Sequence, residues 1–125
     1  MSSKIEMYVP TVDGDGQALP LEIAYRWRDH VAHTLTELFG GCTCVQASGY
    51  YRNTKGNVVM EDVNVVYSYT EKEQADLSHR RVIELAKRLC AGLRQECVLV
   101  VYDGKCEYDD DEFEDDWDSE ADWKI

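Results

Sequence analysis

Hydrophobic and polar residues alternate at the start of the chain. Over residues 4–9 every second side chain is apolar, which predicts a half-buried β-strand that ends at Pro10. The turn-rich segment TVDGDGQALP follows. From Leu21 the apolar residues recur every three or four positions, which predicts an amphipathic helix that ends at the glycine pair 40–41.

A β-hairpin is predicted after this helix, because two alternating stretches flank a glycine-containing turn. With the tip at Lys55, Ala47 lies opposite Val63 and Val45 lies opposite Val65. This register gathers the apolar side chains on one face, which we expect the helices to cover. The opposite face then carries side chains that stay solvated or pair with a second subunit, making a homodimer an expectation: Tyr8, Gln46, Ser48, Tyr50, Asp62 and Asn64.

The remaining pattern predicts a second helix and a buried strand. Thr70 and Glu73 have the spacing of a capping box, and an apolar stripe follows as far as Leu93. The apolar run 97–102 predicts a buried strand, and 105–108 a short edge strand. The predicted fold is therefore α+β: a ferredoxin-like β-α-β-β-α-β two-layer sandwich with an acidic C-terminal tail.

Charge divides the chain into two predicted parts. The formal net charge is −12, and residues 107–125 hold eleven Asp/Glu and one Lys. We therefore expect a ferredoxin-like domain over 1–106 and an acidic, aromatic-containing tail over 107–125. Direct nucleic-acid binding is disfavoured because phosphates repel such a chain, and no apolar run is long enough to cross a membrane.

The tail predicts an interaction role, because large aromatic side chains stand among its carboxylates. Aromatics anchor an interface, and carboxylates supply steering and specificity. The leading hypothesis is a non-enzymatic binding protein, for instance an inhibitor that offers a phosphate-mimicking tail to a basic nucleic-acid-processing protein. The predicted contact residues are Asp109, Asp110, Asp111, Glu112, Phe113, Asp115, Asp116, Trp117 and Trp123.

The partner of this tail is expected to be a basic protein surface. It can be external, or it can be the outer side of the chain's own second helix. That side carries Arg80, Arg81, Lys87, Arg88 and Arg94.

The alternative hypothesis is a small-molecule-binding domain or small enzyme with its pocket at the hairpin. The candidate residues are Tyr50, Arg52 and Glu61. In the predicted register Glu61 lies opposite Gly49 on the apolar face, where a carboxylate is costly unless it is paired or protonated. Either its pKa is raised for acid–base chemistry, or it pairs with Arg52 or a hydroxyl as a structural contact.

The hairpin also resembles a family of small uncharacterised bacterial ferredoxin-like domains, over residues 39–69. The similar positions are Gly41, Thr43, Gly49, Tyr50, Tyr51, Arg52, Gly56, Val58 and Glu61. The resemblance implies the fold and carries no assigned activity.

The five cysteines predict free thiols in a reducing compartment, because their number is odd and no signal peptide accompanies them. We expect a cytoplasmic location on this basis. Cys42 and Cys44 form one close pair without a second, and His30 and His33 lack further ligands nearby. Structural cysteines are therefore favoured over a zinc site, and no cofactor is expected.

Overall fold

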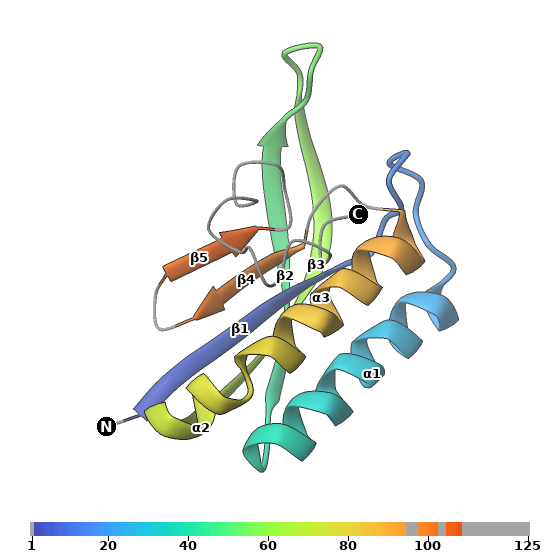
Figure 1. Ribbon diagram of the computed structural model, residues 1–125. Helices are drawn as coiled ribbons and strands as arrows, with labels where there is room; N and C mark the ends of the chain where they lie inside the picture. Colours follow the sequence, from blue (N-terminus) through green and yellow to red (C-terminus); the bar gives the residue numbers. More distant parts are fainter. Residues whose placement is uncertain (1, 95–97, 103–104, 109–125) are drawn as a thin grey trace.

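The computed structural model describes residues 2–94, 98–102 and 105–108 (Figure 1). Its elements in chain order are β1 (Ser2–Pro10), α1 (Leu21–Phe39), β2 (Thr43–Arg52), β3 (Val58–Glu71), α2 (Lys72–Leu77), α3 (His79–Leu93), β4 (Leu99–Tyr102) and β5 (Lys105–Tyr108). The helices lie on one face of the sheet, so the described chain has two layers. None of the helices in this part of the chain has the length and apolar character that a membrane span requires.

The sheet has five strands in the order β2-β3-β1-β4-β5, and every pairing is antiparallel. The first four strands have the order of a ferredoxin-like fold, with β1 and β3 in the centre. The short strand β5 extends the sheet beyond β4. The predicted ferredoxin-like α+β architecture is confirmed, while the tail residues 109–125 lie outside the described part of the chain.

The core lies between the sheet and α3. Ile5, Met7 and Val9 of β1 are fully buried, and Leu89 of α3 is also inaccessible. Complete burial of one such side chain stabilises the fold by about 1.5–3 kcal/mol. The fold thus rests on the alternation in β1 and the helical period in α3.

The predicted hairpin register is confirmed, but the predicted orientation of the hairpin is wrong. Ala47 lies opposite Val63 and Val45 opposite Val65, as expected. The β3 residues with even numbers lie opposite the buried residues of β1. Val66, for example, lies opposite Met7. Paired residues of an antiparallel ladder point to the same face. The face under the helices therefore carries the residues predicted for the open face, with the exception of Tyr8: Gln46, Ser48, Tyr50, Asp62 and Asn64.

The physical reason for this reversal is the pair of adjacent valines in β3. Val65 and Val66 are 6% and 0% exposed, so both parities of β3 carry an apolar residue at this point. A shift of one residue moves every side chain to the opposite face. Which face of the hairpin lies under the helices is determined by the register between β3 and β1. The alternation within the hairpin carries no information about that register.

The second predicted helix is two helices, and the predicted capping box does not form. Strand β3 continues to Glu71, and Thr70 pairs with Ser3 of β1. Helix α2 begins at Lys72 without a side-chain cap, and a break at Ser78 separates it from α3. The extended conformation demanded by pairing with β1 overrides the local capping signal. The first helix is confirmed, and it ends at Gly40 in the left-handed conformation.

Candidate functional site

A cleft of about 400 Å³ lies between the start of α1 and the base of the hairpin. Three segments form it: the loop between β1 and α1, the first turns of α1, and the middle of β2 with its partner positions in β3. The lining residues are Thr11, Ala18, Leu19, Leu21, Ala24, Tyr25, Gln46, Ala47, Ser48, Asp62, Val63 and Asn64. Its volume is within the range of roughly 300–1,000 Å³ that is typical of small-molecule sites.

The loop that forms one wall of the cleft is held in place by α3. The Gly14 N–H donates to the Leu93 carbonyl at 3.1 Å, and Arg94 pairs with Asp15 at 2.9 Å. A Cβ atom on Gly14 would lie 1.6 Å from the Arg94 carbonyl oxygen, so only glycine fits this approach. Asp13 closes the loop by accepting hydrogen bonds from two backbone N–H groups. The residues that predicted a turn therefore hold the loop between β1 and α1 in a defined position, where it forms one wall of the cleft.

The wall is also tied directly to the hairpin. The Thr11 hydroxyl donates to the Asp62 carbonyl oxygen at 2.5 Å. This bond joins residues 51 positions apart in the sequence, and both of them line the cleft. The hydrogen bond therefore holds the loop between β1 and α1 in a defined position relative to the hairpin.

Asn64 is the most informative residue in the cleft. Its side chain is only 3% exposed and lines the cavity. Among the described residues its amide has no hydrogen-bond partner. An unsatisfied buried amide costs about 1–3 kcal/mol, so its partner is expected from whatever occupies the cleft.

The other polar side chains extend the same face of the hairpin. Gln46 pairs with Asn64 across the ladder, and Ser48 pairs with Asp62. Neither the Gln46 amide nor the Ser48 hydroxyl has a side-chain hydrogen bond within the described residues. Gln46, Ser48 and Asp62 are exposed, whereas Asn64 is buried, so the cluster runs from solvent into the wall of the cleft.

The opposite wall of the cleft is apolar and aromatic. Leu21 and Tyr25 are 71% and 40% exposed at the start of α1. The Arg28 guanidinium lies 4.4 Å from the centre of the Tyr25 ring and also pairs with Asp29. Of the described residues that line the cleft, none is Lys, Arg or His, and Asp62 is the one carboxylate. The site therefore favours neutral or cationic groups over anions.

The three residues predicted for a hairpin pocket do not point to one place. Tyr50 and Arg52 pair with positions on the helix-side parity, while Glu61 pairs with Gly49 on the opposite parity, as the sequence predicted for that pair. The Arg52 guanidinium donates to the Gly56 carbonyl at 2.9 Å and so closes the turn. The Glu61 carboxylate has no ion pair or hydrogen bond with any described residue. The assignment of these residues to a ligand site stays a prediction.

Burial raises the pKa of the Glu61 carboxyl above its ordinary value. The cause is desolvation, because no charged neighbour contributes to the shift. The raised pKa fits the sequence-based argument that this carboxylate stands among apolar side chains. Its position on the helix-free face separates it from the polar cleft.

The basic helix face exists, and Arg94 at its end is engaged in an ion pair. Arg80, Arg81 and Arg88 are exposed on α3, whereas Arg94 lies past the last turn and pairs with Asp15. The predicted acidic contact residues, 109–125, are outside the described part of the chain. Docking of the tail, in cis or on an external basic protein, stays a prediction.

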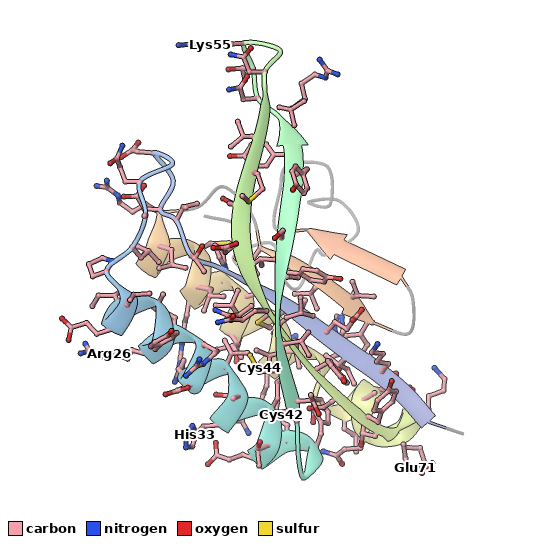
Figure 2. All side chains as sticks on the ribbon, turned by 180° about the vertical axis from the view of Figure 1, so that it is seen from behind. Arg26, His33, Cys42, Cys44, Lys55 and Glu71 are labelled. Atoms are coloured by element: carbon pink, nitrogen blue, oxygen red, sulfur yellow. The ribbon has the colours of Figure 1, made fainter. Side chains whose placement is uncertain are left out.

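The cysteine pair at the start of β2, of which Cys42 precedes the strand, lies outside the lining of the cleft. Cys42 and Cys44 lie beside α1 at the end of β2 remote from the hairpin tip, which Lys55 marks (Figure 2). The Cys42 thiol contacts the Thr36 hydroxyl and the Ala32 carbonyl at 3.5 Å. Burial raises the pKa of the Cys44 thiol, with Arg28 opposing the shift. No group of three or more His, Cys, Asp and Glu side chains suited to a metal occurs among the described residues.

Sequence reasoning missed the cleft, although its signal was present. Gln46, Ser48, Asp62 and Asn64 alternate on two paired strands and share one face. The sequence placed them together correctly and assigned them to the open side of the sheet. On the helix side, the same cluster becomes the wall of a cavity.

Comparison with solved structures supports the fold. A phage SAM lyase in complex with S-methyl-5'-thioadenosine is similar with a TM-score of 0.61 and 18% sequence identity, covering 90% of this chain and 92% of that one. The divalent cation tolerance protein Cut A1 from Thermus thermophilus gives 0.51 and 17%, with 82% of both chains covered. CutA1 from Ehrlichia chaffeensis gives 0.51 and 10%, covering 81% and 78%. At these identities the likeness shows the fold alone.

Comparison with curated proteins finds no match. A family model described as a protein of unknown function, DUF3574, matches residues 6–108. That span includes every described strand and helix except the first residues of β1. It bears out the resemblance of the hairpin to a family of uncharacterised domains. The chain belongs to the DUF3574 family of proteins of unknown function.

Proposed function

We propose that the protein binds a small neutral or cationic molecule in the cleft between α1 and the hairpin. The observation that carries this proposal is the buried Asn64 amide, which faces a 400 Å³ cavity without a protein partner among the described residues. Native proteins satisfy nearly all buried polar groups, so a buried amide without a protein partner on the wall of a cavity is a candidate contact for a bound molecule. The binding role corresponds to the alternative hypothesis from the sequence, with its location moved from the hairpin tip to the hairpin base.

The lining narrows the class of ligand. A carboxamide presents a donor and an acceptor side by side, which suits the edge of a nitrogen heterocycle such as adenine. Leu21 and Tyr25 offer an apolar wall for a ring or thioether, and Asp62 suits hydroxyl groups or a positive charge. The part of the lining that the structure describes contains no cationic side chain, which disfavours phosphates. A nucleoside without phosphate groups combines these features.

The similar phage SAM lyase adds a concrete probe. That protein is in complex with S-methyl-5'-thioadenosine, an uncharged nucleoside with an apolar sulfur substituent. The two chains share a fold, and the similarity therefore serves here only to select a compound for testing. The argument for binding rests on the residues of the cleft. Binding is the proposed activity, and a chemical step on the ligand is not part of the proposal.

The test is isothermal titration calorimetry of the full chain with S-methyl-5'-thioadenosine, SAM and adenosine 5'-monophosphate. We expect saturable binding of the first two compounds and at least about tenfold weaker binding of the phosphate, because Asp62 repels it. The variant Asn64→Leu keeps the side-chain size and should abolish binding, since it removes the buried amide.

Ser68→Ala is the matched control. Ser68 lies on the same face of β3, is 2% exposed, and already donates to the Gly41 carbonyl at 2.7 Å. We expect this variant to lose stability and to keep ligand affinity. The proposal would be contradicted if adenosine 5'-monophosphate bound as tightly as S-methyl-5'-thioadenosine, or if Asn64→Leu bound S-methyl-5'-thioadenosine as tightly as the parent chain.

The interaction hypothesis for the acidic tail is a separate proposal. It rests on the concentration of carboxylates and aromatic residues over 107–125. Because those carboxylates repel anions, they are compatible with a cleft that accepts neutral or cationic molecules.

A further inference from the structure

The outer half of the hairpin extends beyond the rest of the sheet. The pairing of β3 with β1 stops at Val63, opposite Pro10. From residue 48 to residue 62 the two hairpin strands pair with each other alone. We call residues 48–62 the arm, and Figure 1 shows it projecting past the helices and the other strands.

The arm exposes large apolar side chains on both of its faces. Tyr50, Val58 and Met60 are 70%, 65% and 53% exposed on one parity. Tyr51 is 46% exposed on the other. A two-stranded hairpin without further packing is marginally stable in water, and a contiguous exposed apolar surface marks an interaction site. The arm therefore has the composition of a surface that another chain covers.

The outer strand of the arm also lacks protection at its edge. Strand β2 is the first in the sheet order, so no strand of this chain lies beside its outer edge within the described residues. Its sequence, TCVQASGYYR, contains no proline, and its single charge is Arg52 at the end. Edge strands of monomeric proteins are normally kept short or interrupted by charges and prolines. Strand β5, at the other edge of the sheet, is short, with four residues.

Charge identifies the kind of partner. The arm contains Arg52 and Lys55 against Glu61 and Asp62, which gives a formal net charge of zero. The whole chain carries −12, so two copies repel each other over most of their surface. A neutral, apolar strand pair is the part of the molecule on which two copies approach at the lowest electrostatic cost.

The outer edge of β2 is long enough for strand pairing, because β2 has 10 residues and strands in globular proteins usually have about 3–10. We propose that this protein self-associates through the arm, with a second copy of the chain adding backbone pairing along the outer edge of β2. Edge pairing satisfies the free backbone groups and covers the aromatic side chains in one step. The inference is independent of the ligand proposed for the cleft.

The test is sedimentation equilibrium of the full chain over about a hundredfold range of concentration, since self-association depends on concentration. The expected mass exceeds the monomer mass of 14.4 kDa and rises with concentration. The variant Met60→Glu should shift the dissociation constant upward by at least about tenfold, because it places a charge in the centre of the apolar surface.

Leu77→Glu is the matched control, because Leu77 is 80% exposed on α2 outside the arm. It introduces the same charge and should leave self-association unchanged. Circular dichroism on both variants reports whether they are folded. A parent chain that stays at 14.4 kDa throughout, or equal effects of the two variants, would overturn the inference.

Discussion

The helix-covered face of the sheet has two regions with opposite chemistry. Beneath α3, β1 and β4 present residues such as Met7 and Val100, which are at most 1% exposed. Near the start of α1, β2 and β3 present amides, a hydroxyl and a carboxylate around a cavity. Both regions belong to one continuous sheet, and their side chains alternate with the same period.

The difference lies in how the helices approach. The inner side of α3 carries Val82, Leu89 and Leu93, all buried against the sheet. At the first turn of α1, Leu21 is 71% exposed, and the space between that turn and the hairpin is the cleft. A sheet face thus serves as core where a helix packs closely and as a site where the helix leaves room.

The largest expected effect comes from contrasting one residue of each region. Leu89→Ala removes a fully buried side chain and should lower the free energy of unfolding by about 2–5 kcal/mol. Asn64→Leu should leave stability unchanged or raise it by up to roughly 1–3 kcal/mol, because it removes an unsatisfied buried amide. Urea denaturation followed by circular dichroism measures both. If Asn64→Leu lost as much stability as Leu89→Ala, the cleft lining would contribute to the fold in the same way as the core beneath α3.

A smaller effect is expected from disturbing the wall of the cleft without touching its lining. Gly14→Ala brings a Cβ atom against the Arg94 carbonyl, so the loop must move and its bond to Leu93 is weakened. We expect a loss of about 1–3 kcal/mol in the free energy of unfolding and weaker ligand binding.

Gly41→Ala is the control for this change, because a Cβ atom at Gly41 meets nothing within 4 Å. Thermal denaturation and calorimetry on the two variants test the prediction. The cleft wall would not depend on this contact if both variants behaved like the parent chain.

The smallest expected effect concerns Glu61 on the helix-free face. Its pKa in the folded chain is raised by burial, so the fold disfavours the ionised carboxylate. The unfavourable contribution is absent while the group is protonated in both folded and unfolded states. It develops as the pH rises from the ordinary value of 4.5 through the raised folded pKa, and above that value it is complete.

Glu61→Gln should therefore be slightly more stable than the parent at neutral pH and equally stable below the ordinary carboxyl pKa. Unfolding midpoints in urea across this pH range measure the difference. A gain that persists unchanged in acid would show that the substitution acts through packing and has no link to the charge.

The hairpin shows how far local pattern reaches. Alternation fixed which residues share a face, and the turn around Lys55 fixed the register to the correct residue. The choice of face failed because Val65 and Val66 make both parities apolar in the middle of β3. The capping signal at Thr70 failed for a related reason, since pairing with Ser3 keeps that residue in the strand.

The sequence by itself determined the order of the strands, the place of α1, the core of α3 and the pairing of the hairpin. These depend on contacts between residues close in the chain or on periodicity, and both can be read locally. Only the tertiary structure decided which face of the hairpin the helices cover, and hence that four alternating polar residues enclose a cleft. That decision comes from the register of β3 with β1 and the path of α1, which are contacts between segments far apart in the sequence.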